Sequence, residues 1–352
     1  MIAKLLKYLF LLLVLVLVVS TISYFRGINS FNSEEGKDVR FVITQGEGVK
    51  KIGKNLADKD LIGSKFYFEI YVWRKKKETE FQAGTYNLNS RMSIVEIVEI
   101  LTSGLTVKNE RKITIIEGWN LRDVGQYFER EGMFQSEELL ELVGFPKIDY
   151  RYNKDMERPK DYSDKLSLLK DKPKYYSLEG YLFPDTYIIY NDASLEDIVL
   201  KMLHNFDSKL TSKMREDIKK QEKTIYEIIT MASVIEKEVR DPEEMKIVSG
   251  IFWKRIDVWQ PLQSCASLAY ILGINKPVYS IEDTKIESPY NTYQNYGLPP
   301  GPICNPGLAA IEAAIYPKET EYNYFLSKKE NGETVFSRTI EEHNLNKAKY
   351  LK

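Results

Sequence analysis

An uncharged apolar run near the N-terminus, from Tyr8 to Phe25, is the feature that most constrains how this chain can fold. It is close to the length that crosses the hydrocarbon core of a bilayer, where only a helix can satisfy its own backbone groups. Lys4 and Lys7 precede it, so the positive-inside bias predicts residues 1–7 in the cytoplasm and everything after Arg26 outside. A cleaved signal peptide is the alternative, but the run is long for one and lacks a small-x-small cleavage site. We therefore expect an uncleaved single-pass anchor, residues 8–25, in the cytoplasmic membrane.

A short tether and a weak internal repeat are expected after the anchor. Residues 26–38 contain Asn, Ser, Gly and acidic side chains, which are typical of a tether. In residues 39–149, each of two copies passes from a β-rich run through a Gly-containing turn into two amphipathic helices. Such βαα units resemble LysM-type glycan-binding modules, and a scaffold that binds nothing is an equal alternative. The matched residues include Ile43 with Ile115, Gly46 with Gly118, Val49 with Leu121, Gly53 with Gly125 and Ser64 with Ser136.

The rest of the chain divides by composition into two parts. Residues 150–176 are charged and lack a clear period, which is typical of a surface insertion or a hinge between domains. Residues 177–352 hold every stretch with site-like chemistry, and they mix helical periods with a terminal β-hairpin pattern. The expected fold class is α+β: an N-terminal transmembrane helix, LysM-like βαα units, and then a mixed α+β catalytic domain.

Composition excludes several functions. Lys plus Arg number 50 and Asp plus Glu number 51, so the chain lacks the basic excess of a nucleic-acid binder. The two histidines, His204 and His343, are far apart and form no HExxH pattern, which argues against a zinc site or a Ser-His-Asp triad. We expect neither a metal nor a cofactor.

Glu236 is the strongest candidate for a catalytic residue. It lies on a helix predicted from Thr224 to Arg240, where Thr224 and Glu227 have the spacing of a capping box. Glu236 falls within the apolar stripe of this helix, and a carboxyl held among apolar side chains has a raised pKa, as a general acid requires. The structural alternative is a buried ion pair with Arg240 one turn later. The stripe consists of Ile225, Ile228, Ile229, Ala232, Ile235 and Val239.

Several ordered motifs carry a family resemblance. The segments "ASVIEKE", "LQS", "YNTY", "GLPPGPI" and "NPG" follow one another in an order and spacing that resemble the endolytic murein transglycosylases of the YceG-like family. The anchor, the LysM-like region and "EGYLFPDTY" agree with the resemblance, which covers nearly the whole chain outside residues 150–176. It implies a membrane-anchored enzyme that cuts nascent peptidoglycan strands between MurNAc and GlcNAc, and it maps the family's catalytic glutamate onto Glu236. Peptidoglycan synthases are expected partners.

One carboxyl is sufficient for this chemistry. A hydrolytic glycosidase uses two carboxyl groups, whereas a lytic transglycosylase needs no water. Glu236 can protonate the glycosidic oxygen and then accept the proton of the C6 hydroxyl of MurNAc, which closes a 1,6-anhydro ring within the same sugar. Two alternatives stay open: a hydrolytic muramidase that uses a second carboxylate, and a non-catalytic wall-binding scaffold.

Glu179 and Asp185 are the candidates for that second carboxylate or for substrate contacts. They flank the segment "GYLFP" in an alternating stretch, so either can face a cleft. An Asp that follows Pro more often bonds its own turn. Glu238 is expected on the opposite helix face from Glu236, in solvent.

Two polar loops supply further candidates for sugar binding. The amide of Gln263 and the hydroxyl of Ser264 can bond hydroxyl or acetamido groups, and satisfying loop backbone groups is the alternative role. Asn291, Thr292 and Tyr293 place polar groups beside an aromatic ring, which favours saccharide recognition over a merely rigid loop.

Cys265 and Cys304 are the two cysteines of the chain. They can form a disulfide outside the cytoplasm or remain as two thiols, because spacing alone does not establish proximity. Relative to the family pattern, Cys265 replaces an Asp that commonly follows the Gln-Ser pair, which puts any role of that acidic position in doubt.

Overall fold

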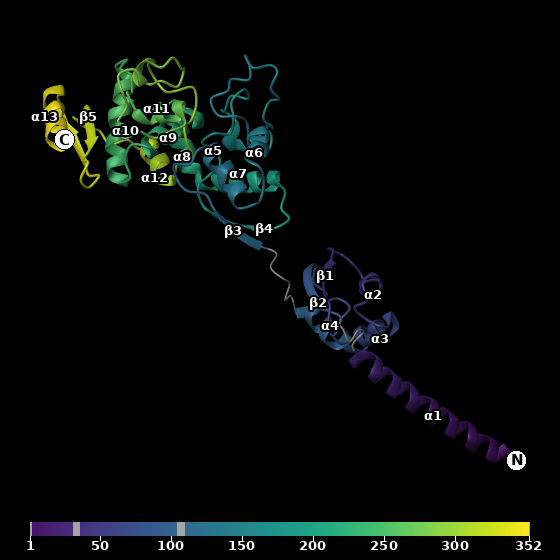
Figure 1. Ribbon diagram of the computed structural model, residues 1–352. Coiled ribbons are helices and arrows are strands. Elements are labelled where there is room, and N and C mark those ends of the chain that lie inside the picture. The colour runs from purple at the N-terminus through teal and green to yellow at the C-terminus, as the bar shows by residue number, and fades with distance from the viewer. Residues whose placement is uncertain (1, 31–35, 104–109, 277, 352) are drawn as a thin grey trace. The chain divides into compact units, whose positions relative to one another are not determined.

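The computed structural model describes residues 2–30, 36–103, 110–276 and 278–351. The chain forms two compact units (Figure 1). Unit 1 comprises Met1–Arg111 and Tyr190–Asp192, and unit 2 comprises Lys112–Ile189 and Ala193–Lys352. The thirteen helices and three small two-stranded sheets of the described residues confirm a mixed α+β fold.

Unit 1 begins with the long apolar helix α1 (Ile2–Asn29). An 18-residue window within its segment Leu6–Asn29 has a mean hydropathy of 2.5, and α1 is the one helix of the described chain that is long and apolar enough to cross a membrane. The predicted span 8–25 lies inside it. The helix also takes up the first residues of the expected tether, and residues 31–35 of that tether lie outside the described residues.

The remainder of unit 1 is a βααβα arrangement. Strands β1 and β2 pair antiparallel, with Phe41 opposite Tyr86, and both of these side chains are buried. Helices α2, α3 and α4 cover the pair and complete a core of their own. The elements are β1 (Asp38–Ile43), α2 (Val49–Asp58), α3 (Lys65–Lys75), β2 (Gly84–Asn89) and α4 (Ile94–Ser103).

The second copy of the repeat has the same βααβ order, and almost all of it belongs to unit 2. Strand β3 is followed by α5 and α6, and the returning strand β4 pairs with β3. The division between the units falls after Arg111, so the second copy shares a compact body with residues 177–352 and not with the first copy. The elements are β3 (Glu110–Thr114), α5 (Leu121–Arg130), α6 (Ser136–Val143) and β4 (Thr186–Tyr190).

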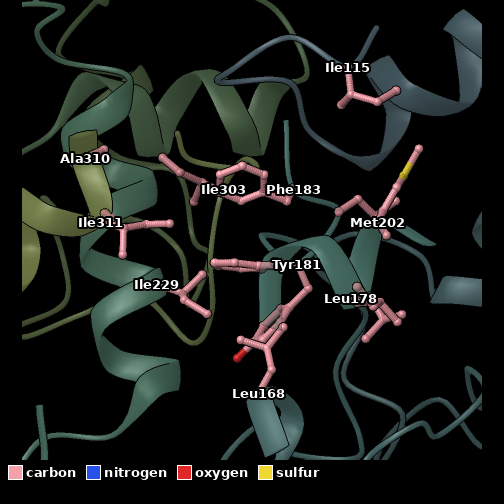
Figure 2. Packing of buried hydrophobic residues seen from close by; sticks show 14 of the residues in the cluster. Ile115, Leu168, Leu178, Tyr181, Phe183, Met202, Ile229, Ile303, Ala310 and Ile311 are labelled. Carbon is pink, nitrogen blue, oxygen red and sulfur yellow. The ribbon is translucent and has the colours of Figure 1, made fainter. Parts of the chain in front are cut away.

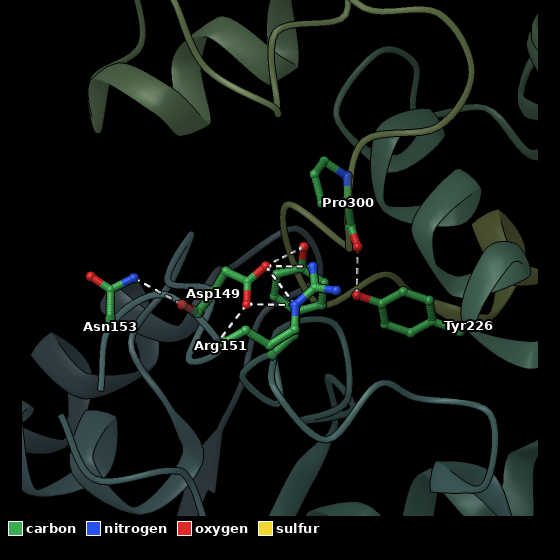
Figure 3. A network of polar contacts seen from close by, with 6 residues as sticks. Asp149, Arg151, Asn153, Tyr226 and Pro300 are labelled. Atoms are coloured by element: carbon green, nitrogen blue, oxygen red, sulfur yellow. Dashed lines mark hydrogen bonds and ion pairs between the residues drawn. The ribbon is translucent and has the colours of Figure 1, made fainter. Parts of the chain in front are cut away.

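Residues 150–176 lie inside unit 2, between α6 and β4, and do not connect the two compact units. Four of their buried side chains, Tyr162, Leu166, Leu168 and Leu169, join the core around the short helix η1 (Ser167–Leu169), which is why the segment is not a mere surface insertion. Asp149 and Arg151 form a 2.7 Å ion pair at its start (Figure 3).

Helices form most of the remainder of unit 2. The buried helix α9 packs against α10 and α12, and side chains from distant segments, among them Tyr181, Ile229, Ile303 and Ile311, meet in one core (Figure 2). Strands β5 and β6 form the expected terminal hairpin. The elements are α7 (Leu195–Lys209), α8 (Ser212–Lys220), α9 (Ile225–Glu236), α10 (Pro242–Asp257), α11 (Cys265–Leu272), η2 (Asp283–Lys285), α12 (Leu308–Ile315), β5 (Tyr324–Ser327), β6 (Thr334–Ser337) and α13 (Ile340–Tyr350).

Candidate active site

Glu236 is the last residue of α9. The Thr224 side chain accepts from the Glu227 N–H and the Glu227 carboxylate accepts from the Thr224 N–H, so the predicted capping box is present. The helix ends at Glu236 because Lys237 caps it, four residues earlier than predicted. Arg240 is therefore not one helical turn beyond Glu236, and among the described residues the groups that act on the Glu236 carboxyl are Gly307, Glu117 and Lys237, not Arg240. The structural alternative of a buried Glu236–Arg240 pair has no support.

The Glu236 carboxyl is partly buried and bonded to a backbone amide. Its Oε2 atom accepts a 2.9 Å hydrogen bond from the Gly307 N–H, at the N-cap of α12. Burial raises the pKa of Glu236; the Gly307 N–H and the Lys237 ammonium oppose this effect, and the nearby Glu117 carboxylate adds to it. The net pKa is raised, which favours the protonated form that a general acid needs.

Three separate segments meet around this carboxyl: the turn 117–119, the end of α9, and the turn 305–307. The fully buried Asn305 links the two turns, since its side chain donates to the Trp119 carbonyl at 2.9 Å; the same side chain accepts from the Leu182 N–H at 2.9 Å. The Lys237 Nζ donates to the Gly118 carbonyl at 3.2 Å. The second copy of the repeat therefore supplies one wall of the candidate site.

Glu117 is a functional candidate that the sequence patterns did not reveal. A Cβ added to Gly307 would lie 2.0 Å from Glu117 Oε1, so the Glu117 side chain occupies the space that any other residue at 307 would fill. Both carboxyl groups thus approach the same glycine. The available signal was the repeat itself: Glu117 corresponds to Gln45 of the first copy, so the second copy has a charge where the first has an amide.

Glu179 and Asp185 lie elsewhere and have other partners. Glu179 is buried; its carboxyl accepts from the Leu121 N–H at 3.0 Å and from the Tyr270 hydroxyl at 3.2 Å. Burial raises the pKa of Glu179 to about 8. Asp185 accepts from Asn205 at 3.0 Å and pairs with a lysine of α7. The structure brings neither carboxyl into a contact with Glu236 among the described residues.

The loops that carry the predicted sugar-binding residues pack on each other. Ser264, Asn291 and Thr292 are buried, and their polar atoms are bonded within the protein; the Ser264 N–H, for example, donates to Thr292 Oγ1 at 3.0 Å. The Gln263 side chain is exposed, and Tyr293 is partly exposed. Ser264, Asn291 and Thr292 thus bond within the protein, whereas the Gln263 side chain is exposed and the Tyr293 hydroxyl contacts the Cys265 thiol at 3.1 Å.

Glu238 differs from its expected solvated position. It is partly buried and accepts a hydrogen bond from the Ser264 hydroxyl. Burial raises its pKa, and the Ser264 bond opposes the effect. Cys265 is exposed and Cys304 is buried, and both are free thiols, so the disulfide is absent. Within the described residues no group of three or more His, Cys, Asp or Glu is placed to hold a metal.

Comparison with known proteins identifies the family. Residues 41–349 match the model of the YceG-like family, to which the chain belongs. It is 35% identical to the endolytic murein transglycosylase of Bacillus subtilis (strain 168), over 89% of this chain and 85% of that protein. The protein of the same name from Streptococcus pneumoniae (strain D39) is 32% identical, over 90% of this chain and 59% of its own length. A crystal structure of a yceG-like protein from Listeria monocytogenes, 31% identical, matches 89% of this chain and all of that one with a TM-score of 0.57.

Proposed function

We propose that the chain is a membrane-anchored endolytic peptidoglycan lytic transglycosylase that cleaves the MurNAc–GlcNAc bond of nascent strands. One observation carries the proposal: a partly buried carboxyl, Glu236, whose pKa is raised, is held where three segments of unit 2 converge. The relatives named endolytic murein transglycosylases support it, because they match nearly the whole chain.

Glu236 acts first as an acid and then as a base. Its proton goes to the glycosidic oxygen as the C1–O bond of MurNAc breaks, and positive charge develops at C1. The resulting carboxylate takes the proton of the C6 hydroxyl, whose oxygen bonds to C1, so Glu236 ends protonated as it began. Burial favours the acid form, and the Gly307 N–H stabilises the carboxylate between the two steps.

The anchor sets the location of the reaction. Helix α1 holds the enzyme in the cytoplasmic membrane with its N-terminus inside and everything after Arg26 outside, in keeping with Lys4 and Lys7 before the apolar run. The βααβ unit of residues 38–89 contacts glycan as a LysM-like module. Peptidoglycan synthases are the partners that supply the nascent strands.

The test compares the products of the full-length enzyme with those of Glu236→Gln. Purified in detergent and given peptidoglycan, the wild type should release fragments with 1,6-anhydro-MurNAc ends, measured by mass spectrometry, and Glu236→Gln should release essentially none. Glu243→Gln, at an exposed position of α10, is the matched control and should retain full activity. Equal cleavage by Glu236→Gln and wild type contradicts the proposal.

Hydrolysis is the second candidate, and Glu117 is the observation that favours it. A carboxylate beside the acid is what a muramidase uses as nucleophile or base. The same digest distinguishes the two, because a hydrolase leaves reducing MurNAc ends that carry an oxygen from water. In the scaffold alternative the wild type itself releases no fragments, and the defect in cells follows deletion of residues 39–144 and not Glu236→Gln.

A further inference from the structure

The last turns of α1 pack directly on α3 within unit 1. Ser23 Oγ and the Tyr67 hydroxyl share a 2.7 Å hydrogen bond, and Ile28 is buried in the unit 1 core. A Cβ on Gly27 would lie 2.3 Å from the Tyr67 ring, so the two helices approach closely at this glycine. About 20 residues cross the hydrocarbon core of a bilayer. A span that begins at Leu6 therefore leaves the hydrocarbon core between Ser23 and Ile28. Helix α3 is therefore held at the level where α1 meets the headgroups.

Helix α3 leaves large apolar side chains in solvent on one face. Phe66 is 66% exposed and Trp73 is 70% exposed. Residues seven positions apart lie on the same side of an α-helix, and the partly exposed Ile70 falls between them. Phe68 and Val72, on another face of the helix, fill the unit 1 core. The exposed stripe is thus separate from the face that holds the fold together.

Basic residues lie at the C-terminal end of α3 and directly after it. Arg74, Lys75 and Lys76 are exposed, and Lys77 next to them is partly buried. The acidic residue of α3, Glu69, is paired with Lys65 at 3.4 Å. Arg74 lies 5.0 Å from the centre of the Tyr24 ring of α1, so the basic run begins beside the anchor. Aromatic rings beside clustered Lys and Arg are the side chains that favour the interface of an anionic membrane.

We propose that α3 is a membrane-docking surface. Through it, the part of unit 1 that follows α1 lies on the anionic headgroups of the bilayer that α1 crosses. Phe66 and Trp73 insert at the boundary of headgroups and acyl chains, and Arg74, Lys75 and Lys76 contact lipid phosphates. The inference rests on the proposed anchor. Its consequence is that the first βααβ unit is held at the membrane surface, where a newly made strand emerges.

The experiment uses the full chain in vesicles and measures the tryptophan emission of Trp73 by difference. Four variants are compared with wild type by fluorescence, with phosphatidylglycerol present or absent and with acyl chains brominated near the headgroup. The difference in emission between wild type and Trp73→Phe gives the Trp73 emission. The difference between wild type and Trp259→Phe gives the emission of Trp259, a control in unit 2 that is 79% exposed. Flotation with the vesicles measures the anchor separately, so failure of the anchor and failure of docking are distinguished.

With phosphatidylglycerol present, brominated lipid should cut the Trp73 emission by about half and leave the Trp259 emission unchanged, because interfacial side chains reach the start of the acyl chains. Lys75→Gln with Lys76→Gln should weaken this quenching while flotation persists. The matched pair Lys50→Gln with Lys54→Gln, exposed on α2, should not. The proposal is overturned if brominated lipid does not quench the Trp73 emission. If acrylamide in the aqueous phase quenches it instead, Trp73 lies in solvent. If neither bromine nor acrylamide quenches it, Trp73 is covered by a second copy of the chain.

Discussion

Glu179 gives the sharpest prediction because its environment prescribes a pH dependence of stability. Its pKa is about 8 in the folded chain against an ordinary 4.5, because burial penalises the charge. An acid whose pKa is higher in the folded than in the unfolded chain contributes its full stabilisation below the pKa of the unfolded chain. That contribution is lost as the pH rises through the pKa of the folded chain. Between pH 5 and pH 8 the free energy of unfolding of unit 2 should fall by roughly 3–4 kcal/mol on account of this one carboxyl.

Replacing Glu179 by Gln removes the titration and keeps the shape. The amide oxygen can still accept from the Leu121 N–H, the first N–H of α5, which the Asn120–Asp123 capping box leaves free. We expect Glu179→Gln to match or exceed wild type in stability at pH 8, and to lose the part of the pH dependence between pH 5 and pH 8 that this carboxyl contributes. Urea unfolding of the full chain in detergent, followed by tryptophan emission at several pH values, measures both.

Asp185→Asn is the matched control. The pKa of Asp185 is lowered; burial, the largest single influence, raises it, but the hydrogen bonds to Asn205, the Thr186 N–H and Lys209 together outweigh burial. The stabilisation that Asp185 contributes is therefore lost only as the pH falls below 5. Between pH 5 and pH 8, the change of the free energy of unfolding with pH should be the same in Asp185→Asn as in wild type. An unchanged slope in Glu179→Gln would refute a neutral, structural Glu179 and return it to the candidates for a second catalytic carboxylate.

Three further variants test the site. Glu117→Gln removes the charge that helps to raise the pKa of Glu236, so the alkaline limb of the pH profile of kcat/KM should move to lower pH; an unmoved limb contradicts the coupling. Gly307→Ala displaces the Glu117 side chain without altering either carboxyl and should move the limb in the same direction. Ser264→Ala leaves Glu238 without its hydroxyl donor and should lower the free energy of unfolding by about 1–3 kcal/mol, measured by urea titration.

The sequence predicted those features that local patterns determine. The start of α9 followed from Thr224 and Glu227, because a capping box is a contact within four residues. The apolar helix of the anchor followed from composition alone. The end of α9 was misplaced by four residues, since the apolar period continues to Val239 while the helix ends at Glu236. Val239 is buried outside the helix, which the period cannot distinguish.

The arrangement of the site depended on tertiary contacts that no local pattern contains. Asn291 and Thr292 read as sugar-binding because polar groups lie beside an aromatic ring, yet Asn291 donates to the Ile286 carbonyl at 2.7 Å within its own loop. Residues 112–149 read as part of a separate module, yet they share a core with the remainder of unit 2. The hydrophobic periodicity of a segment shows that the element has an apolar face. It does not show which other element covers that face.

The Glu117 carboxylate changes the argument for a single catalytic carboxyl. On the sequence, the case for transglycosylation over hydrolysis was that Glu236 had no convincing partner, and the structure supplies one within reach of Gly307. Proximity alone does not make Glu117 a nucleophile. A like charge beside a partly buried acid raises the pKa of that acid, which serves proton donation in either mechanism. The two roles separate in Glu117→Gln: a tuning role shifts the pH profile and keeps 1,6-anhydro ends, whereas a nucleophile or base role abolishes cleavage at every pH.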